Sequence, residues 1–322
     1  MRTLIIMKSA VLAIAALGFS ANASEYPDKP VRVVVPYGPG GGVDTFTRPI
    51  AAALSEQTGQ SFVVENKPGG GGTIGVRVVA HAPSDGYMLL SGGVHQAMAE
   101  SIYPNRGYIL DRNFTPLGFT AVVPNVLIVN AATPFKTLKE LLDYGKANPS
   151  KLNYCSSGVG TAQHLVAEMF MAATSIQMTH IPYTGTAAAL TDLMGGHCQV
   201  MFDGLGTSAP LIKSDKVRAL AFTTKNRSPY FPDIPTTREA GGPDMDAGIW
   251  YGLWAPAQTP SERITYLQEQ IKVALKSEKI RKIFEAQGAT ISEKPVGELP
   301  AFVSAEIEAW TKISKATGAG VK

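Results

Sequence analysis

The sequence predicts an α/β protein of two lobes, each built on a mainly parallel β-sheet with helices on both faces. Short apolar runs rich in Val and Ile alternate with amphipathic helical patterns, an alternation typical of parallel sheets covered by helices. The alternation occurs in two successive series, and a chain of 322 residues is long enough for two domains.

The first series begins shortly after residue 30. Strands are predicted at residues 31–36, 61–65 and 87–91, and helices at residues 44–58 and 73–81. This β-α-β-α-β order predicts parallel strands, because each helix carries the chain back to the same end of the sheet.

The second series follows the same logic. Its predicted elements are strands at 125–130, 152–155, 178–182, 199–203 and 217–222, and helices at 137–147, 161–173 and 186–194. A Pro-, Gly- and Asp-rich stretch at 227–248 is interpreted as a crossing loop, followed by a strand at 249–255, a helix at 261–277 and two further helices. We therefore expect lobe 1 to comprise residues 24–124 and 225–322, and lobe 2 to comprise residues 125–224.

The amino-terminus is predicted to be a secretory signal peptide, residues 1–23. Arg2 and Lys8 give it a positive start, and residues 10–19 form an apolar run too short to span a bilayer. The small-x-small sequence that ends at Ala23 is a cleavage site. We expect cleavage after Ala23 and a periplasmic location.

Charge argues against one class of partner. The formal net charge of +3 falls to +1 when Arg2 and Lys8 leave with the signal peptide. Met7 is an alternative start, and the mature chain would be the same. A nearly neutral chain with 17% charged residues gives no electrostatic case for nucleic acid.

A glycine-rich loop between the first strand and the first helix is one candidate binding site. Glycine lets backbone N–H groups approach a ligand closely, and the following helix N-terminus favours an anion. Asp44 is expected to be the N-cap of that helix. The alternative is a tight turn without a ligand. The candidate residues are Tyr37, Gly38, Gly40, Gly41 and Asp44.

A second loop has the same strand–loop–helix context in the second series. Hydroxyl groups, glycine amides and another helix N-terminus come together there. Two such loops, one per lobe, suggest a shared cleft that holds an anion from both sides. The candidate residues are Ser156, Ser157, Gly158, Gly160, Thr161 and His164.

Three more residues follow strand ends, where ligands bind in open α/β sheets. They are His95, Tyr183 and Asp203. Asp203 has an alternative interpretation as the cap of a backbone turn. Residues 70–75 match the pattern G-x-G-x-x-G, but no acidic residue follows at the spacing of a dinucleotide site, so we interpret them as a flexible loop.

No catalytic pattern is evident in the sequence. There is no His-Glu-x-x-His spacing and no Gly-x-Ser-x-Gly elbow, so we expect neither catalytic residues, nor a metal, nor a cofactor. Cys155 and Cys198 are the only cysteines. Their predicted places in two strands favour a buried thiol pair with Cα atoms beyond bridging range, although a disulfide stays open.

The motifs together resemble the Bug family, the periplasmic solute-binding receptors of tripartite tricarboxylate transporters. Residues 26–44 are similar to the family's opening signature, and residues 66–87 and 153–164 to its next blocks. Later blocks match at residues 182–185, 201–203, 232–236 and 255–260, so that the resemblance covers essentially all of the mature chain.

The resemblance implies a Venus-flytrap fold, similar to type II binding proteins, and an aliphatic or aromatic mono-, di- or tricarboxylate ligand. It implies that residues 37–44 and 156–161 carry the site, with Asp203 nearby, and that residues 95–102 influence which ligand fits. The expected partners are membrane permease subunits of a tripartite tricarboxylate-type transporter. A ligand-sensing subunit for a membrane sensor kinase is the alternative, and a periplasmic enzyme a more distant one. We expect a monomer.

Overall fold

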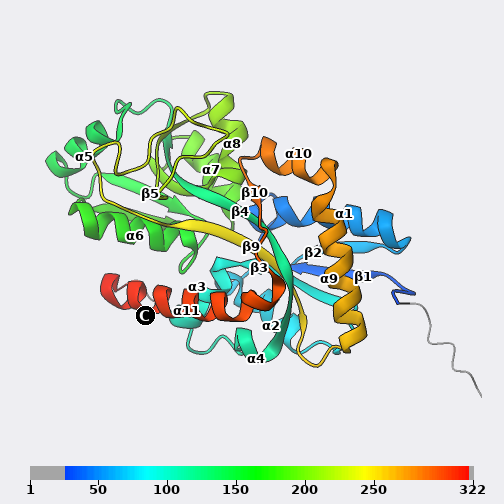
Figure 1. Cartoon of the computed structure of the whole chain (residues 1–322). Helices are drawn as coiled ribbons and strands as arrows, with labels where there is room; N and C mark the ends of the chain where they lie inside the picture. Colours follow the sequence, from blue (N-terminus) through cyan, green and yellow to red (C-terminus); the bar gives the residue numbers. More distant parts are fainter. Residues whose placement is uncertain (1–25, 319–322) are drawn as a thin grey trace, which may run out of the picture.

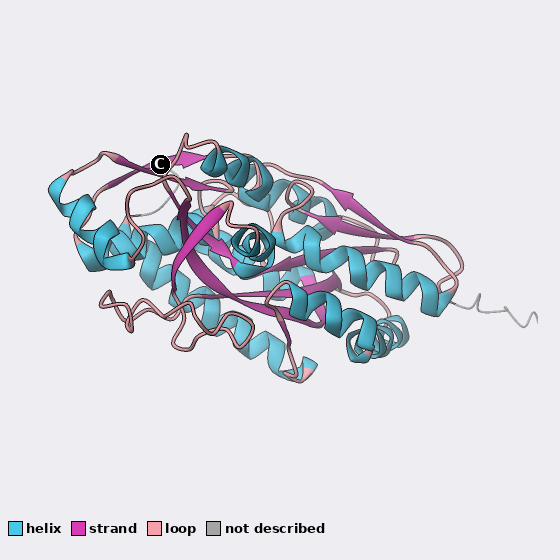
Figure 2. Ribbon diagram, turned by 90° about the horizontal axis from the view of Figure 1, so that it is seen from above, coloured by secondary structure: helices cyan, strands magenta, loops and turns pink. Residues whose placement is uncertain are grey.

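The computed structural model describes residues 26–318, so the predicted signal peptide lies outside the described residues. The chain forms two β-sheets that share one long strand (Figure 1). Viewed from above, the strands run between layers of helices (Figure 2). The two-lobed α/β architecture expected from the sequence is confirmed.

The first sheet has the strand order β2-β1-β3-β9-β4. Strands β1 (Val31–Val35), β2 (Phe62–Asn66) and β3 (Met88–Gly93) are parallel, whereas β9 (Gly248–Pro256) is antiparallel to both β3 and β4 (Phe114–Asn130). A short strand, β10 at residues 290–291, also pairs with β4. Because β1 is covered on both faces, its sequence is a continuous run of apolar residues interrupted only by one arginine.

The second sheet has the order β6-β5-β7-β4, with β8 on the other side of β4. Strands β5 (Leu152–Ser156), β6 (Met178–Pro182) and β7 (Val200–Gly204) are parallel, whereas β7 and β8 (Val217–Phe222) are both antiparallel to β4. The sheet is therefore parallel on the side that carries the predicted second loop.

Strand β4 belongs to both sheets. Residues 114–124 pair with β9, and residues 125–130 pair with β7 and β8. The sequence prediction placed only residues 125–130 in this strand and was wrong about its start. Pro116, Gly118 and Pro124 gave residues 114–124 the sequence pattern of a loop. In the structure this segment is nevertheless part of the sheet, because register shifts on both sides of Gly118 accommodate these residues in the pairing with β9.

The chain returns from the second lobe through residues 223–247, close to the crossing of β4. The Thr223 amide donates to the Asn125 carbonyl at 2.9 Å, and the Ala247 amide donates to the Thr223 carbonyl at 2.7 Å. The Thr223 hydroxyl also lies within hydrogen-bond distance of the Asn125 and Ala247 carbonyls, so these bonds join the two crossing segments.

Helices follow most of the strands, as predicted. They are α1 (Gly42–Thr58), α2 (Thr73–Ala80), α3 (Val94–Ile102), α4 (Leu110–Asn113), α5 (Leu138–Ala147), α6 (Ala162–Thr174), α7 (Thr186–Met194), α8 (Leu205–Lys213), α9 (Ser261–Lys276), α10 (Glu278–Ala286) and α11 (Leu299–Thr317), with 3-10 turns η1 (Gly70–Gly72) and η2 (Val296–Glu298). The sequence prediction omitted α3, α4 and α8. Gly206 and Pro210 are poor helix formers that concealed α8, which begins directly after β7 without a separating loop.

Cys155 and Cys198 form a disulfide, with Cα atoms 6.0 Å apart. The expectation that these atoms lie beyond bridging range was therefore wrong. Cys155 lies within β5, whereas Cys198 lies just before β7, the neighbouring strand, so adjacent strands bring the two side chains together.

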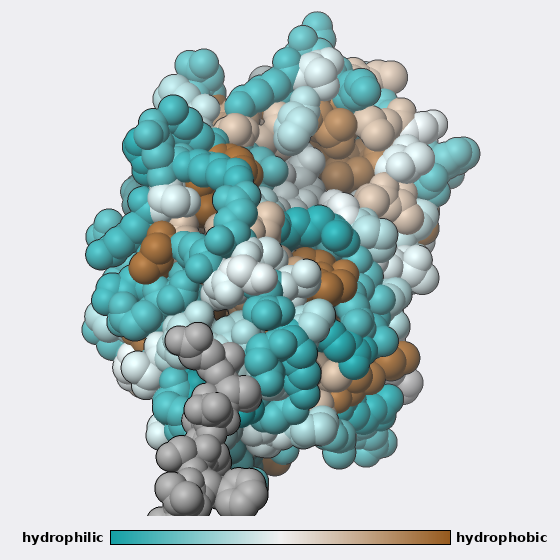
Figure 3. All heavy atoms as spheres, turned by 90° about the vertical axis from the view of Figure 1, so that its right-hand side faces the viewer, coloured by the Kyte–Doolittle hydropathy of each residue, from teal (hydrophilic) through white to brown (hydrophobic). Residues whose placement is uncertain are grey.

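The face drawn in Figure 3 is mainly hydrophilic, and its hydrophobic residues gather in small separate patches. Between residues 26 and 318, no helix has the length and apolar character that crossing a bilayer requires.

Candidate ligand-binding cleft

A small cavity lies between the lobes, at the carboxyl ends of strands from both sheets. Its walls come from both lobes and from β9: Tyr37, Gly41, Gly42, Val43, His95, Ser157, Gln163, Thr186, Asp203, Gly204, Thr207, Ile249 and Tyr251. The cavity volume is about 20 Å³, which is room for about one water molecule. The cleft is therefore closed in this structure.

Contacts between the lobes hold the cleft closed on two sides. The Tyr103 hydroxyl, at the end of α3, donates to the Val159 carbonyl of the second-lobe loop at 2.7 Å. On the other side, a Cβ added at Gly41 would lie 3.6 Å from Oγ1 of Thr186. The two glycine-rich loops thus face opposing helix ends across the cleft.

Three helices begin at the cavity with no side chain capping them. The N-cap residues are Gly41 for α1, Gly185 for α7 and Gly204 for α8, and none of these helices has a side-chain hydrogen bond at its cap. The first N–H groups of a helix have no partner within the helix, and the helix dipole places positive charge there. Their convergence from both lobes favours an anion in the cavity.

Asp44 supports the first loop from inside helix α1. The helix begins at Gly42 with Gly41 as N-cap, so the prediction that Asp44 is the N-cap was wrong; the helix starts two residues earlier. The carboxylate accepts hydrogen bonds from the Gly40 amide at 2.9 Å, from Arg48 at 2.8 Å and from Asn66 at 2.9 Å.

These bonds decide the charge of Asp44. Burial alone would raise its pKa, but the hydrogen bonds from Arg48, the Gly40 amide and Asn66 outweigh burial and hold the pKa below its ordinary value. Asp44 is thus an ionised group that fixes the loop, and its oxygens are occupied by donors of its own lobe.

Tyr37 forms the floor of the first loop. Its hydroxyl donates to the Gly71 carbonyl at 3.1 Å, and its ring packs edge-on against His95 with centroids 5.2 Å apart. A Cβ at Gly72, which has φ +96°, would lie 2.6 Å from the Tyr37 hydroxyl oxygen. Gly72 therefore makes room for Tyr37, as Gly71 does for Tyr103 and Gly75 for the backbone of Pro36, so local packing accounts for these glycines without a dinucleotide.

His95 lies in the first turn of α3 and is buried at the cavity wall. Among the described residues its Nδ1 atom has no hydrogen-bond partner. Burial lowers the pKa of His95 from 6.5 to about 4, so the ring is neutral at pH 7. An unpaired polar atom at a cavity wall is costly, and a ligand group can satisfy it.

Asp203 and Gln163 form the second-lobe wall. Gln163 accepts from the Ser157 amide at 2.5 Å and donates to Thr186 at 3.2 Å and to Asp203 at 2.7 Å. Thr207 donates to the other carboxylate oxygen of Asp203 at 2.6 Å. Burial raises the pKa of Asp203 from 3.8 to about 6, although these donors oppose the rise.

The remaining predicted residues of the second loop bond to one another. The Ser156 hydroxyl hydrogen-bonds to His180 at 2.6 Å, and the Thr161 hydroxyl donates to the Gly158 carbonyl at 2.7 Å. The Gly160 amide donates to His164 Nδ1 at 3.1 Å. These residues lie behind the cavity wall and set the shape of the loop.

Tyr183 also faces away from the cavity, since its hydroxyl donates to Asp192 at 2.6 Å. Of the predicted residues, the structure thus brings five to the wall: Tyr37, Gly41, His95, Ser157 and Asp203. No group of three His, Cys, Asp or Glu side chains that could hold a metal ion is found within residues 26–318.

Comparison with known proteins identifies the family of the chain. Residues 46–319 match the family described as the tripartite tricarboxylate transporter family receptor, TctC. Protein BugT of Bordetella pertussis is 33% identical over 313 residues, which cover 97% of this chain and 96% of BugT.

The chain belongs to the TctC receptor family.

Solved structures of similar proteins agree with this assignment. A protein of R. palustris solved with adipate has a TM-score of 0.89 and 35% identity, covering 92% of this chain and 100% of its own. MatC from Rhodopseudomonas palustris with bound malate has a TM-score of 0.85 and 31% identity, covering 89% of this chain and 99% of its own. As a TctC receptor, this chain is a solute-binding protein of the periplasmic binding protein fold and not an enzyme.

Several wall residues of the receptor were missed by the sequence analysis: Gln163, Thr186, Thr207, Ile249 and Tyr251. Gln163 stands two residues after Thr161, and Thr186 is the first residue of a predicted helix. Both residues thus lie at the start of a predicted helix that follows a strand, and this position could have indicated a place in the cleft. Thr207 lies on a helix that was not predicted, and Tyr251 comes from the returning strand β9, so local patterns could not have found them.

Proposed function

We propose that this receptor captures a small aliphatic or aromatic carboxylate in the cleft and delivers it to the membrane subunits of a tripartite tricarboxylate-type transporter. The observation that carries the proposal is the convergence of three uncapped helix N-termini on one interlobe cavity. Backbone N–H groups at helix ends are suited to hold a carboxylate.

The composition of the wall supports recognition by amides instead of by ion pairs. No Lys or Arg is among the residues that line the cavity. Arg48, the nearest base on α1, is occupied by Asp44 and Asn66. Tyrosine, serine and threonine hydroxyls and the neutral ring of His95 supply the other polar groups. The adipate and malate bound by the two similar proteins support a carboxylate here.

Ligand exchange requires the lobes to separate, because the closed cavity holds only about one water molecule. We propose that the lobes, residues 24–124 with 225–322 and residues 125–224, rotate about the crossing near Asn125, Thr223 and Ala247. Small-angle scattering would then show a smaller radius of gyration with ligand than without it.

The location follows from the predicted leader. We propose that residues 1–23 direct export and are removed, so that the protein acts in the periplasm. The disulfide between Cys155 and Cys198 supports an oxidising compartment. Mature protein should begin at Ser24, and an N-terminal sequence that begins at Met1 or Met7 would rule out the cleavage.

A thermal-shift screen tests the ligand class. Small mono-, di- and tricarboxylates are compared, each beside its neutral amide, because an amide brings N–H groups toward donors and leaves some unpaired, at about 1–3 kcal/mol each. Ligand at about 100 times its Kd stabilises the protein by about 2.7 kcal/mol. At least one carboxylate should raise Tm while its amide does not; stabilisation by sugars or amides alone would reject the proposal.

Co-purification with solubilised membranes separates the two partner proposals. Recovery of transporter membrane subunits in the presence of the carboxylate supports the transport role. Recovery of a sensor kinase instead would replace transport by ligand sensing.

A further inference from the structure

A second cavity lies on the opposite face of strand β9 from the cleft. It has a volume of about 350 Å³, within the range of small-molecule sites. On β9, Tyr251 lines the cleft and its neighbour Trp250 lines this second cavity, since adjacent side chains of a strand point to opposite faces. We call the second cavity the rear pocket.

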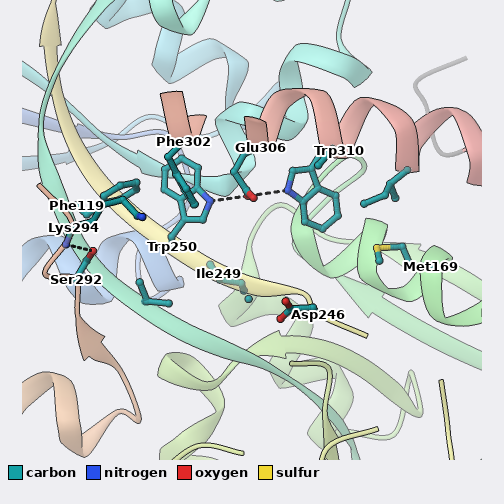
Figure 4. Close-up of a pocket in the computed structure, with 14 residues that line it drawn as sticks. Phe119, Met169, Asp246, Ile249, Trp250, Ser292, Lys294, Phe302, Glu306 and Trp310 are labelled. Carbon is teal, nitrogen blue, oxygen red and sulfur yellow. Dashed lines mark hydrogen bonds between the residues drawn. The ribbon is translucent and has the colours of Figure 1, made fainter. Parts of the chain in front are cut away.

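The rear pocket has an aromatic wall organised around one carboxylate (Figure 4). Glu306 of α11 accepts from the indole N–H of Trp250 at 2.9 Å and from that of Trp310 at 3.1 Å, both on Oε2. Phe119 and Phe302 pack edge-on against Trp250, with centroids 5.3 and 5.4 Å away. The wall thus combines four aromatic rings with a carboxylate held in place by two of them.

The polar groups of the pocket select the charge of an occupant. Both indole N–H groups are already used by Glu306, so they are not available to an anion. Both of these bonds are on Oε2, which leaves Oε1 of Glu306 for an occupant, and Asp246, which pairs with Lys225 at 3.5 Å, adds a second carboxylate to the lining. Aromatic rings beside a carboxylate attract an organic cation.

Lys294, the one basic residue in the lining, also lies beside an aromatic ring and a carboxylate. Its ammonium group lies 5.2 Å from the centroid of the Phe302 ring and 3.8 Å from Glu298. Figure 4 places Lys294 at the end of the pocket away from Trp310, so its charge does not occupy the part between Glu306 and Trp310.

We propose that the rear pocket is a second binding site, which takes a small alkylammonium cation with Glu306 as counter-ion and the indoles of Trp250 and Trp310 as walls. The site adjoins the hinge and both lobes: Met169 of α6 lines it from the second lobe, and Ile249 borders both cavities. A bound cation therefore contacts the strand that also forms the cleft wall.

Intrinsic tryptophan fluorescence can report binding in the rear pocket. The chain has three tryptophans; Trp250 and Trp310 line the rear pocket, and none lines the cleft. Choline is titrated beside 3,3-dimethylbutan-1-ol, which has the same shape without the charge. Choline should give a saturable change, with the neutral alcohol binding at least about fivefold more weakly, because the cation–π and ionic attractions are lost.

Two variants on α11 isolate the charge. In Glu306→Gln the amide oxygen can still accept from both indoles, so the wall is kept while the charge is removed. This variant should bind choline at least about fivefold more weakly. Glu308→Gln is the control, because Glu308 is exposed and pairs with Lys312 at 2.9 Å; it should bind choline as the wild type does.

The outcomes are distinct. No saturable fluorescence change with choline would overturn the site. Equal binding of the alcohol, or unchanged binding in Glu306→Gln, would overturn the cation and show a neutral apolar occupant. Because choline carries no carboxylate and Glu306 does not line the cleft, the result does not depend on whether the cleft takes a carboxylate.

Discussion

Replacing Asp203 by Asn should make the protein more stable at neutral pH. Asp203 is only 1% exposed and accepts from Gln163 and Thr207. Asparagine has the same shape. Its oxygen can accept from Gln163, and the Thr207 hydroxyl can turn to accept from its N–H. The substitution therefore removes the buried charge and keeps these two hydrogen bonds, while the Gly204 amide and the Ser208 hydroxyl, which also donate to the carboxylate, must rearrange.

The pKa sets the size and the sign of the effect. A carboxyl with a pKa of 3.8 in the unfolded chain and about 6 in the folded protein favours the folded state only while it is protonated. That stabilisation is fully present below pH 3.8 and is lost as pH rises through 6. The loss amounts to about 3 kcal/mol in the wild type and is absent in Asp203→Asn.

Urea unfolding at intervals between about pH 4 and pH 7.5 measures the difference. The two proteins should be nearly equally stable at the acid end, and Asp203→Asn should gain up to about 3 kcal/mol over the wild type at the neutral end. His95 and His180, whose pKa values burial lowers to about 4, are common to both proteins and cancel in the difference. Parallel stability curves would show that Asp203 is not the buried, raised-pKa group described.

Three further substitutions test the disulfide, the closed state and the second loop. Changing Cys155 and Cys198 together to Ala should lower the unfolding free energy by about 4 kcal/mol, because the bridge closes a loop of 43 residues; a urea midpoint that matches the oxidised wild type would argue against the bridge. Tyr103→Phe removes the interlobe hydrogen bond to Val159, and should weaken carboxylate binding by about 0.5–1.5 kcal/mol in calorimetry while closure remains possible; undiminished affinity would mean that this contact does not favour the closed form. Gly158→Val places a side chain at φ +137° and 3.3 Å from a neighbouring carbonyl, and should weaken binding by about 1–3 kcal/mol; wild-type affinity in a folded variant would remove the loop from the site.

The sequence predicted the parts of the fold whose signal is local. Buried strands such as Val31–Val35 are runs of apolar residues, and glycine-rich loops follow them where parallel strands end. Tyr37, His95, Ser157 and Asp203, which line the cavity, were predicted because they lie at or just after strand ends. A position at the end of a strand was informative, because the topology brings the carboxyl ends of the parallel strands together at the cleft.

Other features depend on contacts between distant segments and left no local pattern. The length of β4 was hidden by Pro116 and Pro124, which are tolerated because bulges and the crossing between sheets leave places for them. The direction of a side chain was equally invisible: Ser156 turns toward His180 and Tyr183 toward Asp192 instead of the cavity. The disulfide required the spatial order of β5 and β7.

The most direct test of the account is a structure of the receptor with a carboxylate found by the thermal-shift screen. The account predicts that carboxylate oxygens lie within hydrogen-bond distance of backbone N–H groups in the first turns of α1, α7 or α8, between closed lobes. A carboxylate held by a lysine or arginine side chain, or bound outside the interlobe cleft, would contradict it.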